Sequence, residues 1–86
     1  MANYKILKQV DGLENVLNTA RHEIKGYFNK DSCDVVRIRH YQRFEAICET
    51  LKTLGIVDNL TALMEEMWDN GRETQKQIDE RKEKSK

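Results

Sequence analysis

Apolar residues recur every three or four positions over residues 4–29. This spacing is typical of a helix, whose residues advance by about 100° each, and the apolar positions share an arc of roughly 80°. So narrow a stripe resembles the seam between two packed helices, so the pattern predicts a helix over residues 4–29 with one facing partner. The seam consists of Ile6, Val10, Leu13, Leu17, Ala20, Ile24 and Phe28.

The beginning of this helix has a second interpretation. Asp11 and Glu14 stand at the spacing of a capping box, with Asp11 as N-cap and Glu14 at N3. The helix would then start there, and residues 4–10 would form a short strand or a separate turn. Gly12 would lie opposite the seam of a longer helix, where it weakens the helix without interrupting the apolar stripe. We favour the continuous helix over residues 4–29.

A polar break at residues 29–32 separates this helix from a second one, predicted over residues 33–54. Asp31 or Ser32 can accept the first free backbone N–H groups of the second helix. Gly55 is predicted to end it in the left-handed C′ conformation, with Ile56 folding back as C″. The apolar face comprises Val36, Tyr41, Phe44, Ile47, Cys48, Leu51 and Leu54.

A third apolar stripe predicts a helix over residues 58–69, capped by Asp58 and carrying Trp68 beside its apolar face. Beyond Asn70-Gly71 the stripe fades, and charges of both signs are typical of a solvated helix or tail that frays toward Lys86. The sequence therefore predicts an all-α fold, a small three- to four-helix bundle. In this bundle, residues 4–29 and 33–54 form an antiparallel hairpin, and helix 58–69 packs across the hairpin. One domain comprises residues 1–71, and residues 72–86 form a charged C-terminal helix or tail.

Composition limits the range of functions. The 86 residues are 38% hydrophobic and 35% charged, which suits one small domain. Fifteen basic and fifteen acidic residues cancel, so the chain lacks the overall attraction to polyanions of most nucleic-acid-binding domains. No apolar run approaches the roughly 18–20 residues that span a bilayer, and no basic start precedes an apolar stretch. We therefore expect a cytoplasmic protein that does not enter a membrane.

Neither a disulfide nor a metal site is expected. Cys33 and Cys48 would lie about 22 Å apart on one helix, far beyond the reach of a disulfide, and we interpret them as reduced thiols. His22 and His40 have no ligand spacing with the cysteines, so we expect no metal and no cofactor. The sequence also lacks a recognisable nucleophile arrangement or Gly-rich phosphate loop, which argues against an enzyme.

The densest group of functional side chains lies within residues 37–43. Arg39 and Arg43 are neighbours on the solvent side of the predicted helix, where they either form surface ion pairs or contact phosphates. Arg37 and His40 fall within the apolar arc. Arg37 either buries the aliphatic part of its side chain beyond the end of the partner helix or makes a polar contact in a subunit or partner interface. His40 is a candidate for a polar contact in the same kind of interface.

Aromatic and sulfur-containing residues offer a second candidate surface. Phe44, Met64, Met67 and Trp68 either belong to the core or line a groove for a ligand or peptide. The two long predicted helices also expose more apolar seam than a short third helix covers, which favours a homodimer.

The function we favour from the sequence is a small helical adaptor, inhibitor or regulator that binds another protein, of the kind that bacterial or phage genomes encode. The partner-binding residues we single out are Arg37, His40, Tyr41 and Trp68. Two alternatives stay open. A structural subunit of a larger assembly would need no soluble partner, and a nucleic-acid-binding helical protein would use Arg37, Arg39 and Arg43, joined by Lys5 and Lys8 if the N-terminal helix brings them near.

Overall fold

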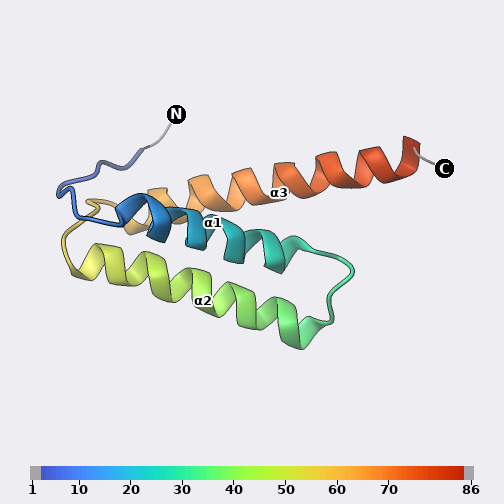
Figure 1. The fold of residues 1–86 in the computed structure, drawn as a ribbon, viewed down its shortest axis with the longest axis horizontal. Helices are drawn as coiled ribbons and strands as arrows, with labels where there is room; N and C mark the ends of the chain where they lie inside the picture. The colour runs from blue at the N-terminus through green and yellow to red at the C-terminus, as the bar shows by residue number, and fades with distance from the viewer. Residues whose placement is uncertain (1–2, 85–86) are drawn as a thin grey trace.

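The computed structural model describes residues 3–84 and contains three helices in this range. They are α1 (Leu13–Phe28), α2 (Asp34–Thr53) and α3 (Leu60–Lys84). Figure 1 shows that α1 and α2 form an antiparallel hairpin and that α3 runs back along it, parallel to α1. The predicted all-α fold and its antiparallel hairpin are confirmed. In residues 3–84 no helix combines the length and the apolarity needed to cross a membrane.

One apolar core joins the three helices. The α1 seam is buried where it was predicted to be, at Leu13, Leu17, Ala20 and Ile24. The largest completely enclosed side chains come from all three helices and from the connection between α2 and α3. They are Phe44, Ile24, Leu63, Val57 and Cys48.

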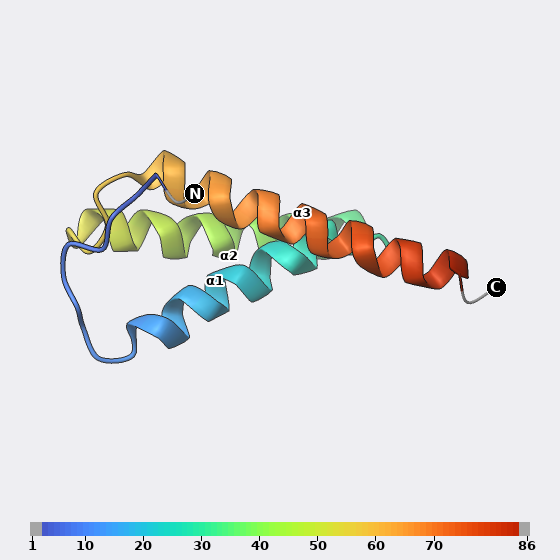
Figure 2. The same cartoon turned by 90° about the horizontal axis from the view of Figure 1, so that it is seen from above.

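The N-terminal segment is extended, so the predicted continuous helix over residues 4–29 is wrong. Ile6 forms an antiparallel bridge with Val57, and the backbone N–H of Leu7 donates to the carbonyl of Ile56 at 2.7 Å. In both Figure 1 and Figure 2 the segment lies beside the start of α3. This pairing satisfies backbone groups of two non-helical segments at once, which an isolated turn of helix could not do.

The helix begins after Gly12, whose φ of 79° lies in the left-handed region. Gly12 itself is the N-cap and no side chain caps the helix, so Asp11 and Glu14 do not form the capping box. The second interpretation is therefore right that residues 4–10 are separate from the helix. It is wrong about the cap, because a glycine turn redirects the chain at that point.

The end of α2 follows the prediction. Gly55 has a φ of 72°, its N–H donates to the carbonyl of Lys52 at 3.0 Å, and the N–H of Ile56 donates to the carbonyl of Leu51 at 2.9 Å. These two bonds define a Schellman motif, and the side chains of Ile56 and Leu51 are both buried. The motif turns the chain so that Ile56 and Val57 enter the core.

The starts of α2 and α3 differ from the prediction. Cys33 is the N-cap of α2, without a side-chain hydrogen bond, so neither Asp31 nor Ser32 caps this helix. At α3, Asn59 caps the helix, because its Oδ1 accepts a hydrogen bond from the N–H of Ala62 at 3.1 Å. Asp58 instead accepts the N–H of Lys5 at 2.6 Å, which anchors the N-terminal segment.

The third helix does not stop at Asn70-Gly71 but continues to Lys84, over 25 residues. Gly71 is buried where α3 meets α1, and a Cβ atom there would lie only 3.2 Å from Ile24 and 3.3 Å from Phe28. This glycine lets two helices approach closely, which is why it does not end one. The predicted fraying at Lys86 lies outside the described residues.

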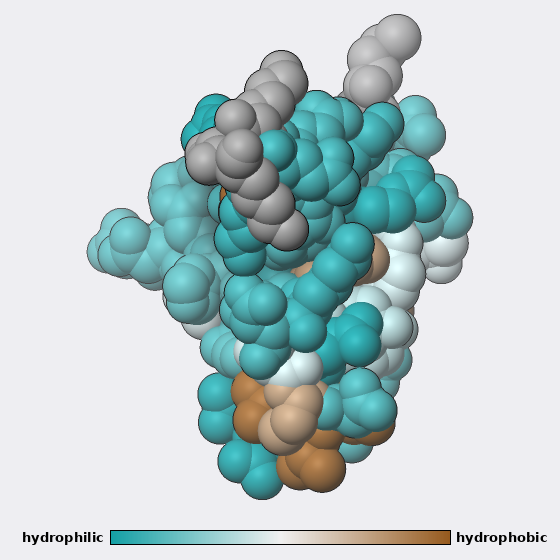
Figure 3. All heavy atoms as spheres, turned by 90° about the vertical axis from the view of Figure 1, so that its right-hand side faces the viewer, coloured by the Kyte–Doolittle hydropathy of each residue, from teal (hydrophilic) through white to brown (hydrophobic). Residues whose placement is uncertain are grey.

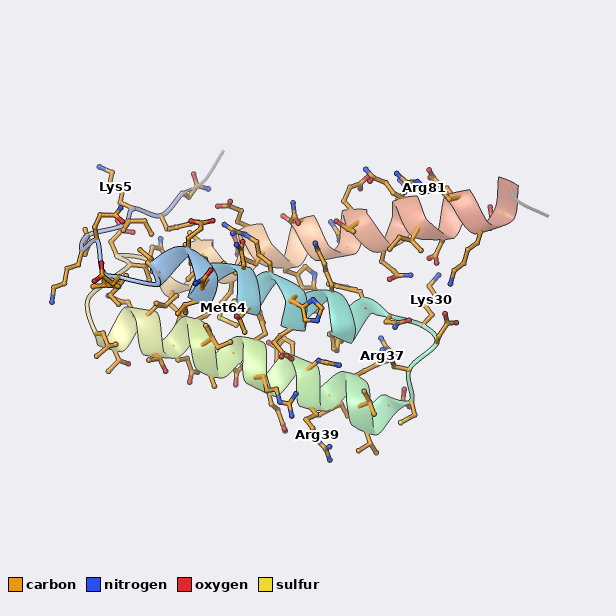
Figure 4. The ribbon with its side chains drawn as sticks, viewed as in Figure 1. Lys5, Lys30, Arg37, Arg39, Met64 and Arg81 are labelled. Carbon is orange, nitrogen blue, oxygen red and sulfur yellow. The ribbon has the colours of Figure 1, made fainter. Side chains whose placement is uncertain are left out.

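The charged half of α3 is tied to the connection between α1 and α2. Lys30 lies 3.0 Å from Asp79, and Lys82 lies 3.0 Å from Asp31. Figure 4 shows Lys30 on this connection, opposite the last turns of α3. These exposed ion pairs are individually weak, but both join the same two segments and orient the end of α3.

Candidate functional site

A cluster of aromatic rings joins the three helices in the middle of the bundle. The ring of Trp68 in α3 lies 4.8 Å from Phe28, 5.3 Å from Tyr27 and 6.0 Å from Tyr41, measured between centroids. Tyr41 also lies 6.0 Å from Phe44 on α2. Tilted and edge-on ring pairs at such distances are each worth about 0.5–1.5 kcal/mol beyond their buried area. The cluster therefore holds Tyr41 and Trp68 in fixed positions.

A pocket of about 280 Å³ opens between α2 and α3. Phe44, which is completely buried, forms its floor, and the half-buried side chains of Tyr41, Met64 and Trp68 form its sides. Its remaining lining residues are Glu65 and Asp69, both on α3. Because α1 packs against both helices while α2 and α3 contact each other least, the seam between them stays open. We call this surface the α2–α3 groove.

Tyr41 and Glu45 interact beside the groove. Burial raises the pKa of the Tyr41 hydroxyl above its usual 10.0, and the Glu45 carboxylate, which accepts its hydrogen bond, raises this pKa further. Tyr41 is therefore a neutral hydrogen-bond donor at physiological pH. The Glu45 carboxylate lies within reach of the groove, one turn along α2 from Tyr41.

Arg37 connects the two helices of the hairpin. Its Nε donates to the carbonyl of Tyr27 at 2.7 Å, and its guanidinium carbon lies 5.2 Å from the centre of the Tyr27 ring. Tyr27 is in the last turn of α1, where carbonyls lack helical partners and a positive charge is favourable. A further contact reaches Asp34 at 3.5 Å. Arg37 therefore caps α1 and is directed away from the groove.

His40 also contacts α1. Its Nδ1 lies 2.7 Å from Oε2 of Glu23, and its ring packs directly against the backbone at Gly26. Arg43, one turn further along α2, reaches the other oxygen of Glu23 at 4.0 Å. The four partner-binding residues predicted from the sequence thus divide into two pairs. Tyr41 and Trp68 come together at the groove, whereas Arg37 and His40 hold α1 against α2.

The five cations of the nucleic-acid alternative do not share one surface. Figure 4 shows Lys5 at one end of the molecule, Arg39 near the middle of its lower edge and Arg37 further toward the other end. The ammonium of Lys8 donates to the carbonyl of Leu54 at the end of α2. Because residues 5–8 are not helical, the N-terminal helix that would have brought both lysines near the arginines is absent. Arg39 is exposed, and Arg43 is exposed but close to Glu23.

The aromatic and sulfur-containing residues that the sequence left ambiguous fall into two groups. Met67 is 2% exposed and belongs to the core, and Phe44 is buried beneath the groove. Met64 and Trp68 line the groove. Position on the helix decides the difference, because Met67 faces the core whereas Met64 and Trp68 lie on the edge toward α2.

The first turns of α2 expose an apolar patch that was not singled out from the sequence. Val35 is 66% exposed and Ile38 is 53% exposed. Figure 3 shows hydrophobic side chains gathered at the end of the molecule where α2 begins. Ile38 precedes Tyr41 by three residues and so lies on the same side of α2, one turn before the groove. The sequence does contain a signal for this patch, because Val35 and Ile38 are apolar residues that lie outside the core-facing arc of the helix.

The two cysteines and the side chains able to bind a metal ion are further candidates for a reactive or metal-binding site. Cys33 is exposed and Cys48 is buried, and both are free thiols. Burial raises the pKa of Cys48 to about 12, which makes this thiol unreactive. Among residues 3–84 no group of three His, Cys, Asp or Glu side chains is arranged to hold a metal ion.

Comparisons with protein-family models, with curated proteins and with solved structures found no match to this chain.

Proposed function

We propose that this protein is a small adaptor, inhibitor or regulator that binds another protein in the α2–α3 groove. The observation that carries the proposal is the pair of half-buried rings, Tyr41 and Trp68, 6.0 Å apart above the buried Phe44. Binding energy in protein interfaces concentrates in Trp, Tyr and Arg side chains that surround a pocket which excludes water. The groove offers two of these three residue types on rigid helices.

Contacts with α1 hold the ring of Trp68 in place, which favours binding. Tyr27 and Phe28 of α1 contact Trp68 without lining the pocket, so the ring is held before any partner arrives. Ordering a side chain on association costs about 0.5–1.5 kcal/mol, and a ring already held in place avoids most of this loss. Met64 completes the lining with a flexible side chain that adapts to the shape of an apolar anchor.

A nucleic-acid surface has less support. The chain has no net charge, Lys5 lies at one end of the molecule far from Arg37 and Arg39, and three of the five cations named for it contact other parts of the chain: Lys8, Arg37 and Arg43. A structural subunit or a homodimer would also use an apolar surface, and the oligomeric state distinguishes these from binding of a different protein.

A capture experiment tests the proposal. Tagged wild-type protein and the variants Tyr41→Ala and Trp68→Ala are incubated with lysate of the source cells, with and without nuclease, after circular dichroism has confirmed that each variant is folded. The matched controls are Val16→Ala and Ile78→Ala, which remove apolar side chains that are each 39% exposed outside the groove. We expect a protein that the wild type and both controls retain and that both groove variants lose, in either lysate.

Two results would contradict the proposal. One is a captured protein that binds both groove variants as well as it binds the wild type. The other is capture that disappears on nuclease treatment, since a partner held by nucleic acid does not need the groove.

A further inference from the structure

Carboxylates stand along both edges of the α2–α3 groove. Glu65 and Asp69 line the pocket from α3, where a spacing of four residues places them one turn apart on the same edge. On the α2 side, Glu45 accepts the hydrogen bond of the Tyr41 hydroxyl. The apolar floor is therefore bordered by negative charge from two helices, although the whole chain is neutral.

These charges are only partly compensated within the protein. Asp69 has Arg72 at 3.4 Å, in an exposed pair. Glu65 makes no hydrogen bond or ion pair within residues 3–84, and the partner of Glu45 is an uncharged hydroxyl. At least two negative charges thus remain beside the rings, and they favour a cationic occupant through complementary charge.

The apolar surface is also longer than the pocket. Ile38 extends it by one turn toward the start of α2, and the distance from Ile38 to Phe44 along the helix axis is about 9 Å. This length matches nearly two turns of a second helix laid along the groove. A docked helix presents apolar side chains at positions i, i+3 or i+4, and i+7, which suits a continuous apolar strip with pockets.

A second copy of this chain fits the groove poorly. A symmetric dimer pairs a surface with itself, so Glu45 and Glu65 of one protomer would face the same carboxylates of the other. Like charges brought together at an interface oppose association. The charge pattern thus favours a different, positively charged partner.

We propose, building on the function proposed above, that the occupant of the groove is a cationic amphipathic helix of another protein. Its apolar anchors occupy the pocket between Tyr41 and Trp68 and extend over Ile38. Its Lys or Arg side chains flank these anchors and pair with Glu45 and Glu65.

A peptide selection tests this inference with defined probes. The probes are displayed helical peptides of about 16 residues, long enough to retain helix content on docking. Apolar residues are fixed at i, i+3, i+4 and i+7, and the remaining positions are drawn equally from Lys, Glu and Gln. Peptides selected on the wild type are then measured against Glu45→Lys/Glu65→Lys. The matched control is Glu14→Lys/Glu66→Lys, which makes the same change of charge near Tyr4, outside the groove.

We expect the selected peptides to be enriched in Lys over Glu. Reversal of the two groove carboxylates should weaken their binding on the order of tenfold, while the control should change it less than twofold. Tyr41→Ala should abolish binding of the same peptides. Circular dichroism confirms that each variant retains its helices.

The other outcomes separate this inference from the function on which it rests. Enrichment of Glu or Gln in peptides that still depend on Tyr41 would overturn the charge assignment and leave protein binding in the groove intact. Peptides that bind equally well to Tyr41→Ala would overturn both. A wild-type dimer in sedimentation that Trp68→Ala dissociates would identify a second copy as the occupant and overturn the cationic partner.

Discussion

Replacement of Gly26 by alanine tests how closely α1 and α2 approach. A Cβ atom at position 26 would lie 2.6 Å from Cγ and Cδ2 of His40, whereas ordinary contacts begin at 3.4 Å. The imidazole must therefore move by about 0.8 Å, a displacement that its contact with Glu23 at 2.7 Å opposes. The glycine thus appears in the helix because the ring of His40 occupies the space of a side chain.

The size of the effect follows from two opposing contributions. Alanine inside a helix is favoured over glycine by about 1 kcal/mol. Against this, a hydrogen bond to a charged group contributes about 1.5–3 kcal/mol, and the His40 and Glu23 side chains are only 26% and 13% exposed. We expect Gly26→Ala to lower the free energy of unfolding by about 0.5–2 kcal/mol if the displaced ring loses this contact.

A double-mutant cycle separates the two contributions. In the His40→Ala background the ring is gone, so the same substitution at Gly26 should stabilise the protein by about 1 kcal/mol. Urea unfolding followed by circular dichroism measures the four free energies. A coupling energy of about 1.5–3 kcal/mol is expected between the two positions. Equal stabilisation in both backgrounds would refute the close packing of His40 against α1.

Three further predictions concern other parts of the bundle. Gly71→Leu should destabilise the protein by about 1–3 kcal/mol, because the added side chain meets α1, and an unchanged midpoint of thermal unfolding would contradict that contact. In the native protein a thiol reagent at pH 8 should modify Cys33 quickly and Cys48 only after unfolding, because Cys48 is buried and its pKa is raised to about 12. Mass spectrometry follows the two modification rates, and equal rates would disprove the burial of Cys48. Hydrogen bonds from Lys30 and the amide of Gln75 lower the pKa of Asp79 below its usual 3.8. The ionised Asp79 carboxylate therefore stabilises the fold at pH values above 3.8, and this stabilisation is lost as the pH falls through the lowered pKa. Asp79→Asn should accordingly reduce the stability in urea unfolding more at neutral pH than at pH 2, and an equal loss at both pH values would contradict the charge pairing.

Local signals in the sequence predicted the hairpin and the end of α2. The seam of α1 from Leu13 to Ile24 repeats at helical spacing over its whole length, so its burial could be foreseen. Gly55 followed by Ile56 predicted the Schellman motif, because both the left-handed turn and its apolar contact are encoded within six residues. Structural features that depend only on residues close together in the sequence could therefore be predicted.

Features that depend on distant contacts were not accessible. Ile6 and Val10 happen to continue the spacing of the α1 seam, yet Ile6 pairs with Val57 on the connection between α2 and α3. Gly71 resembles a helix stop in the sequence and is instead a contact point with α1. In both places a tertiary contact overrides the local pattern.

The candidate site was half predicted. Tyr41 and Trp68 were selected by residue type, and the fold brings them together. Arg37 and His40 were selected for the same reason, but their partners, Tyr27 and Glu23, lie on the preceding helix and only the packing of the hairpin reveals them. The roles of Glu45 and Glu65 depend on which edge of each helix borders the groove, which the sequence pattern does not specify.

The bridge between Ile6 and Val57 has a consequence for the order of folding. Joining two segments about fifty residues apart in an unstructured chain costs about 3.5 kcal/mol of loop entropy, which one short bridge does not repay. Once α1 and α2 have docked, only a linker of roughly five residues remains to be closed, and the loss falls to about 1.4 kcal/mol. We therefore expect the N-terminal segment to be the last part of the protein to dock and the first to detach, which requires the three-helix bundle to be stable without it.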